Sequence, residues 1–226
     1  MLLPAGFALP TSGEPVLISD TTAASSNFAL YHLIQLAQER AVPTTLVDLR
    51  QEGAASHTAV LRKLGIKPPS FLSPSPLPSA STPLFTSSGP SLHATFAALP
   101  KSGLVILDGL SELESIGFSA LDISRFVRAV RDSGVLLAFT LRADLTGEED
   151  KDVEQPELLR RLLRVSGQWW RIQGLQSGRS ADVTGEISRH KLNGQGEDVG
   201  RQNPLQYRLE IAGVKTFAKG TGRGYL

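Results

Sequence analysis

The stretch that decides the fold is Val16-Leu-Ile-Ser-Asp20-Thr-Thr-Ala-Ala-Ser-Ser-Asn27, together with the segment 28–38 that follows it. Residues 16–20 form an almost continuous apolar run, which predicts a buried strand. Segment 28–38 has the periodicity of an amphipathic helix, with an inward face formed by Leu30, Leu33, Ile34 and Ala37. A strand, a short polar loop and a helix in this order form the layout of a phosphate-binding P-loop.

The loop itself lacks the residues that phosphate binding requires. A working P-loop, G-x-x-x-x-G-K-[ST], needs glycines for close approach of the backbone, a lysine for the terminal phosphates and a hydroxyl for magnesium. Here Asp20 and Ser25 stand at the glycine positions, Ser26 at the lysine position and Asn27 at the metal-ligand position. A carboxylate at the mouth of the loop repels phosphate. We therefore expect a nucleotide-binding scaffold without nucleotide, cofactor, metal ion or enzymatic activity.

A second feature of nucleotide-binding folds is the apolar strand Leu104-Val-Ile-Leu-Asp108. In an active ATPase, the acid that ends such a strand (the Walker B segment) holds magnesium. The lysine and the hydroxyl of the P-loop are missing here, so the metal would lack its usual second protein ligand. We therefore favour the alternative that Asp108 caps the segment 110–114.

Strand and helix signals alternate through the first two-thirds of the chain. Further strands are predicted over 44–49, 103–110 and 134–141, and further helices over 57–64 and 120–130 and after Pro156. This alternation favours an α/β fold, with a mostly parallel central sheet flanked by helices and right-handed crossovers. The segment 67–91 is rich in proline and serine, and we interpret it as a loop or insertion with at most a short strand near 84–85.

The pattern changes after Gly167. Strands are predicted over 168–176, 183–191, 205–211 and 214–218, separated by short turns that are typical of antiparallel pairing. A parallel core with an antiparallel extension over 168–220 is the layout of a RecA-like domain. We therefore expect residues 1–226 to form a single RecA-like domain with a degenerate P-loop.

Composition excludes several classes of protein. The 226 residues are 41% hydrophobic, which suffices for one sizeable core, and they include no cysteine, which excludes disulfides and thiolate metal sites. The four histidines are scattered without metal-ligand spacing. There is neither an apolar run of transmembrane length nor a signal-peptide pattern. We expect a cytoplasmic protein, with the nucleus as a second location.

The net charge of +1 hides an asymmetry. Residues 1–159 hold 11 Lys and Arg against 17 Asp and Glu, a balance of −6, and residues 160–226 hold 12 against 5, a balance of +7. A basic C-terminal third indicates a polyanionic partner such as RNA or DNA. The alternative is attraction between the two parts or to a neighbouring subunit. The candidate RNA-binding residues are Arg179, Arg189, Lys191, Lys215, Lys219 and Arg223.

Three further stretches carry a resemblance to a known family. They are Leu107-Asp-Gly-Leu-Ser-Glu-Leu-Glu-Ser-Ile-Gly117, Gly174-Leu-Gln-Ser-Gly-Arg-Ser-Ala-Asp-Val-Thr-Gly-Glu-Ile187 and Tyr207-Arg-Leu-Glu-Ile-Ala-Gly-Val-Lys-Thr-Phe-Ala-Lys-Gly220. With the degenerate P-loop, they make the chain resemble the Elongator complex subunit 6 family, in particular its fungal members. The resemblance extends from Val16 to Gly220, apart from the segment 67–91.

The resemblance implies a function that the residues alone do not. Elongator subunits 4, 5 and 6 are RecA-like proteins that form a hetero-hexameric ring, and this ring binds tRNA and supports wobble-uridine modification by the catalytic Elongator subcomplex. By analogy with RecA-like rings, the loops 142–155 and 177–182 are candidate pore elements. Two alternatives stay open: an atypical NTPase whose composite site is completed by a neighbouring subunit, and a purely structural protein–protein adaptor.

Overall fold

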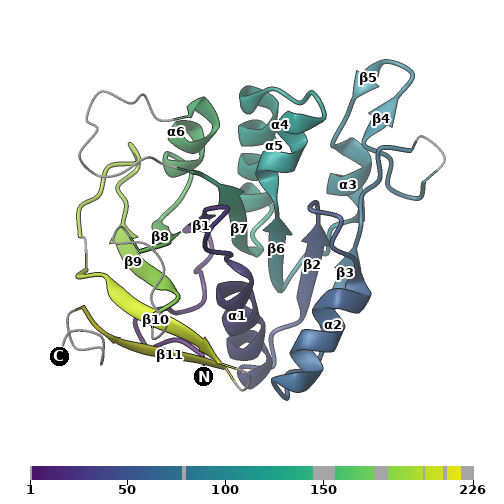
Figure 1. Cartoon of the computed structure of the whole chain (residues 1–226). Helices are drawn as coiled ribbons and strands as arrows, with labels where there is room; N and C mark the ends of the chain where they lie inside the picture. The colour runs from purple at the N-terminus through teal and green to yellow at the C-terminus, as the bar shows by residue number, and fades with distance from the viewer. Residues whose placement is uncertain are drawn as a thin grey trace.

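The computed structural model describes residues 2–77, 80–144, 156–175, 183–200, 202–210 and 213–219. In this part of the chain, nine strands form one sheet in the order β11-β10-β9-β8-β1-β7-β6-β2-β3, and a separate two-stranded ribbon pairs β4 with β5. Helices pack on both sides of the large sheet, and β9–β11 form its left-hand end in the view of Figure 1. Among the described residues, no helix has the length and apolar character needed to cross a bilayer.

The parallel part of the sheet contains six strands, and β1 lies between β7 and β8, at the centre of the nine-stranded sheet. These strands are β1 (Val16–Asp20), β2 (Thr44–Asp48), β3 (Ser70–Leu72), β6 (Leu104–Asp108), β7 (Leu136–Arg142) and β8 (Gln168–Gln173). The helices are α1 (Asn27–Glu39), α2 (Ala54–Lys63), α3 (His93–Ala98), α4 (Leu110–Ser115), α5 (Ala120–Asp132) and α6 (Glu157–Leu163). The predicted α/β class with a mostly parallel sheet is confirmed.

Two apolar cores cover the two faces of the sheet. Every residue of β1 and β6 is buried, as expected of strands covered on both sides. Leu30 and Leu33 of α1 belong to one core, and Phe126 of α5 and Leu162 of α6 belong to the other. The helix periodicity in the sequence identified the inward face of α5 correctly, because a half-buried helix repeats its apolar positions every three to four residues. The face predicted for α1 is buried too, but Tyr31, His32 and Leu36 outside it are also buried.

The antiparallel extension expected from the sequence is present, but it begins at β9 and not at residue 168, because β8 pairs in parallel with β1 on one side and antiparallel with β9 on the other. It comprises β9 (Gly185–Lys191), β10 (Leu205–Glu210) and β11 (Gly213–Ala218), which pair antiparallel in succession from β8 outward. Trp169 and Trp170 of β8 point to opposite faces and belong to different cores. Because both indoles are buried, they stabilise the junction between the parallel and antiparallel parts.

The proline- and serine-rich segment contains more structure than its composition predicts. β3 pairs in parallel with β2 and forms an edge of the large sheet, and the ribbon of β4 (Phe85–Thr86) and β5 (Gly89–Pro90) follows. Leu84 is buried in one of the cores. The expected strand near 84–85 corresponds to β4, whereas β3 was missed. A strand of three residues next to Pro68-Pro69 leaves no periodicity to detect.

His32 connects the N-terminal segment to α1. The Leu3 N–H donates to Nδ1 at 3.2 Å, so Nδ1 is the acceptor, and Nε2 carries the proton that it shares with the Phe7 carbonyl at 2.7 Å. The side chain is fully buried. Burial lowers the pKa of His32 below its ordinary value of 6.5, and the hydrogen bond to Phe7 opposes this only in part. A second proton on Nδ1 would also face the Leu3 N–H donor.

We expect this histidine to make the fold sensitive to acid. Because the pKa is lower in the folded state, the unfolded state binds the extra proton first. The stabilisation is therefore complete above about pH 6.5 and is lost as the pH falls toward the folded-state pKa. Urea unfolding from pH 8 to 5 measures the effect. The His32→Gln variant should lack this component of the slope, and equal slopes for the two proteins below pH 6.5 would contradict it.

Candidate functional site

The carboxylate of Asp20 lies against the first residues of α1. Its Oδ2 accepts hydrogen bonds from the Ser26 N–H at 3.0 Å and from the Ser26 hydroxyl at 2.8 Å, and both residues are fully buried. A helix N-terminus carries partial positive charge and free N–H groups, which is why it binds phosphate in P-loop proteins. We expected Asp20 at the open mouth of the loop, and this is wrong, because its side chain is buried against the start of α1. It occupies the anion position itself.

Other donors of the same loop are also engaged by the chain. Thr22 donates its N–H to one oxygen of Asp144 at 2.8 Å and its hydroxyl to the other at 2.9 Å. The Asn27 N–H donates to Ser25 Oγ at 3.3 Å. The Asn27 amide, at the metal-ligand position, donates to the carboxylate of Glu52 at 3.3 Å. Groups that would hold phosphate and magnesium in a working P-loop therefore hold side chains.

A cation from a neighbouring strand completes the arrangement. Arg50 follows β2, and its Nη2 lies 2.9 Å from Asp20 Oδ2 while its Nε lies 2.9 Å from Asp108 Oδ1. Nη2 also donates to Ser26 Oγ at 3.3 Å and to Thr140 Oγ1 at 3.2 Å. The side chain is only 5% exposed. One guanidinium therefore bridges the residues that correspond to the P-loop and to the Walker B acid.

Asp108 has a different role from the one its position predicts. Its Oδ1 accepts from the Thr140 hydroxyl at 2.6 Å, and the Gly109 N–H donates to the same hydroxyl oxygen at 2.7 Å. We expected Asp108 to cap the segment 110–114, and this is wrong, since α4 begins after Gly109 without a side-chain cap. The carboxylate pairs with Arg50 instead, because a buried charge needs a counter-ion more than a short helix needs a cap.

The electrostatics of this group keep Arg50 charged. Burial alone would lower the pKa of Arg50, but the carboxylates of Asp108 and Asp20 outweigh burial and raise it. Burial raises the pKa of Asp108, while Arg50 and the hydrogen bond from Thr140 act in the opposite direction. A permanently charged guanidinium between two carboxylates replaces the lysine and magnesium of a working site.

A second group of polar side chains surrounds the end of β2. Asp48 accepts hydrogen bonds from the N–H groups of Glu52 at 3.2 Å and Gly53 at 2.8 Å, where α2 begins. His57 Nδ1 shares a hydrogen bond of 3.2 Å with the Tyr31 hydroxyl, and its Nε2 lies 3.8 Å from Glu52. The Glu52 side chain is 34% exposed. The rim of the site therefore presents a further carboxylate, which disfavours an anionic ligand.

Sequence reasoning missed Arg50 and Thr140. A signal for Arg50 existed, because it lies two residues after Asp48 at the carboxyl end of a predicted parallel strand, and such ends meet at one edge of the sheet. Thr140 sits inside an apolar strand and gave no signal. What this arrangement can do chemically is limited, because Arg50 already pairs with one oxygen of each carboxylate. The other oxygens, Asp20 Oδ1 and Asp108 Oδ2, are buried without a hydrogen-bond partner among the described residues, and their negative charge disfavours a phosphate.

The candidate RNA-binding residues divide into two groups. Arg189 and Lys191 lie on β9, at alternate positions of one strand face, as predicted. Lys215 lies 3.1 Å from Glu210, and Lys219 lies 3.3 Å from Glu186. The last two cations are thus engaged within the chain.

Some candidates lie outside the described residues. These are Arg179 and Arg223, most of the loop 142–155 and the whole of the loop 177–182.

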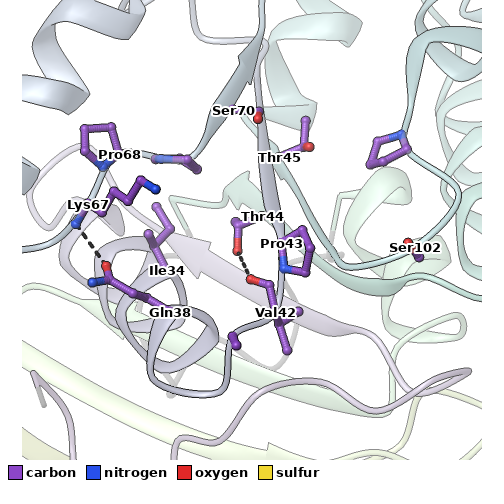
Figure 2. A pocket seen from close by; sticks show the side chains of 13 residues that line it. Ile34, Gln38, Val42, Pro43, Thr44, Thr45, Lys67, Pro68, Ser70 and Ser102 are labelled. Atoms are coloured by element: carbon purple, nitrogen blue, oxygen red, sulfur yellow. Dashed lines mark hydrogen bonds between the residues drawn. The ribbon is translucent and has the colours of Figure 1, made fainter.

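A pocket of about 540 Å³ opens at the amino ends of the parallel strands, whereas Asp20 lies at the carboxyl end of β1. Figure 2 shows its lining, from the end of α1 and the start of β2 to the loop at Ser102. Lys67 is the charged residue of this lining, and its N–H donates to Gln38 Oε1 at 2.9 Å. The pocket lies at the amino ends of β2 and β3, so it is separate from the degenerate nucleotide site.

Comparison with known proteins gives the fold of the chain. No protein-family model and no curated protein matches the sequence. Among solved structures, a KaiC-like protein from the hyperthermophilic archaeon Pyrococcus horikoshii OT3 superposes with a TM-score of 0.62 at 11% identity, covering 96% of each chain. Together with the sheet order, this similarity shows that the chain has a RecA-like fold.

Proposed function

We propose that the chain is a non-catalytic subunit of a RecA-like ring. The observation that carries this proposal is the occupation of the nucleotide site by the chain itself. Asp20 takes the anion position at the start of α1, and Arg50 takes the cation position between Asp20 and Asp108. A nucleoside triphosphate would have to displace two buried carboxylate contacts and approach the Asp20 charge, which costs more than phosphate binding returns.

The proposal predicts that the purified chain does not bind Mg-ATP. Calorimetric titration with up to millimolar Mg-ATP should give only the heat of dilution, and the unfolding temperature should not change. The thermal shift is a sensitive measure, because a ligand at 100 times its Kd adds about 2.7 kcal/mol of stability. Magnesium-dependent binding that disappears on addition of EDTA would contradict the proposal.

The resemblance in three stretches makes Elongator the complex that we propose for this subunit. The chain would form a hetero-hexamer with Elongator subunits 4 and 5, bind tRNA with its basic C-terminal third and support wobble-uridine modification by the catalytic subcomplex. Mixing the three chains and measuring the native mass tests the assembly. A chain that stays monomeric in the mixture contradicts it. Turnover of ATP by the assembled ring that is lost with Asp108→Asn would instead assign a composite NTPase site.

A further inference from the structure

Arg189 and Lys191 line one polar pocket at the amino end of the central strands. Neither forms an ion pair with a carboxylate of the described residues. The pocket has a volume of about 390 Å³, and its lining includes Arg189, Lys191, Gln168, Gln202 and Glu14. Gln168 opens β8 and lies directly opposite Lys191 in the register of β8 and β9. His190 also lines the pocket, and its Nδ1 lies 2.6 Å from the Asp198 carboxylate. Apart from this pair, the charged lining residues are the cations Arg189 and Lys191 and the carboxylate of Glu14, so the pocket is suited to an anion that also accepts and donates hydrogen bonds.

The partners of these cations distinguish them from the other candidates. Within the described residues, no carboxylate lies within ion-pair distance of Arg189 or Lys191, whereas Lys215 and Lys219 each have one. Glu14, the acid of the pocket, accepts a hydrogen bond from the Thr11 hydroxyl at 3.1 Å. The pocket therefore carries a net charge of about +1 at neutral pH, from two cations and one carboxylate with ordinary charges. That charge complements a single phosphodiester.

Neighbouring residues fix the backbone of both cations and the side chain of Arg189. Val199 and Gln202 bond to the end of β9: the Val199 N–H donates to the Lys191 carbonyl at 2.8 Å, and the Gln202 N–H donates to the Arg189 carbonyl at 3.0 Å. The Gln202 side-chain oxygen accepts from Arg189 Nε at 3.2 Å. Gly6 packs beside the guanidinium, with its Cβ position 3.7 Å from Arg189 Cζ. The terminal nitrogens of the fork remain to bind a ligand, and their orientation is set in advance.

We propose that this pocket binds one backbone phosphodiester of an RNA strand. The Cα atoms of Arg189 and Lys191 lie about 6.6 Å apart along the strand, from two residues at about 3.3 Å each, and both side chains start from one face of β9. Both can approach the same phosphate. The Gln168 and Gln202 amides flank them and can meet the adjacent ribose 2′-hydroxyl, the group that distinguishes RNA from DNA. The inference rests on the proposed RNA-binding function and assigns the site of contact within it.

The test measures binding of unmodified tRNA to the full chain by fluorescence anisotropy at several salt concentrations. The pocket variant is Arg189→Gln/Lys191→Gln, and the matched control is Lys215→Gln/Lys219→Gln, which removes the same charge from ion-paired positions. We expect the pocket variant to bind about 10-fold more weakly and to lose about one unit of the slope of log K against log salt, the value for one phosphate contact. The control should change much less. Arg189→Lys should give an intermediate affinity, because the charge stays and the fork is lost.

The possible outcomes separate this inference from the proposed function. If wild type binds tRNA and the pocket and control variants weaken binding equally, the pocket is not the contact, while RNA binding by the chain stands. If wild type binds no tRNA at 50 mM salt, both the RNA part of the proposed function and this inference are overturned. A wild-type chain that binds DNA of the same length equally well would overturn the ribose contact.

Discussion

The Arg50→Met variant is expected to lose about 3–5 kcal/mol of unfolding free energy, because removal of one member of a buried ion pair leaves uncompensated charge. Here two carboxylates, Asp20 and Asp108, lose their cation at once, and both are fully buried. For a domain of this length, such a loss corresponds to a fall in Tm of roughly 6–20 °C. Urea unfolding monitored by tryptophan fluorescence measures it.

Two controls show whether the charge of Arg50 is responsible. Arg128→Met removes an exposed arginine from α5 and should change stability by about 0.5 kcal/mol or less. Adding Asp20→Asn and Asp108→Asn to Arg50→Met removes the stranded charges. This triple variant should be more stable than Arg50→Met alone, since neutral replacement of a buried charged network is often tolerated. A triple variant less stable than the single one would contradict the electrostatic account.

The Gly109→Ala variant is expected to cost at least about 3 kcal/mol, from a left-handed backbone penalty of about 1–2 kcal/mol plus partial loss of the Arg50 pair. Gly109 has φ +96°, and a Cβ there would lie 2.4 Å from Arg50 Cγ. The methyl group would therefore push the arginine away from Asp108. Chemical denaturation and Tm measure the loss.

The chain offers a matched control for this glycine. Gly134 has φ +88° and nothing within 4 Å of its Cβ position, so Gly134→Ala reports the backbone penalty alone. In a double-mutant cycle, Gly109→Ala should cost less in an Arg50→Ala background, where Cγ is gone. Equal losses for Gly109→Ala and Gly134→Ala would mean that Gly109 is needed for its backbone conformation and not for the approach of Arg50.

The buried network around Arg50 gives the degenerate site a structural role. The ends of β1, β2, β6 and β7 all contribute to one hydrogen-bonded group through Asp20, Arg50, Asp108 and Thr140. In a nucleotide-binding protein, the ligand and its metal bring these strand ends together. In this chain the same connection is internal, so the RecA-like edge of the sheet is held without a ligand.

The sequence by itself determined the α/β class, the strands β1, β6 and β7, the helices α1 and α5, and the loss of the P-loop residues. A local sequence pattern indicates each of these, namely an apolar run, a helical period or a short motif at fixed spacing. It also identified Asp20 and Asp108 as the acids of the former site. The three residues of β3 were missed because a strand that short has no period.

The tertiary structure alone decided what those acids contact. Arg50 is 30 residues from Asp20 and 58 from Asp108 in the chain, and Thr22 is 122 residues from Asp144. No local pattern encodes such pairs, since they form only where the carboxyl ends of parallel strands converge. The distinction between Arg189 and Lys191 of β9 and the ion-paired Lys215 and Lys219 has the same origin, because the sequence gives the sign and position of each charge, whereas the assembled sheet decides its partner.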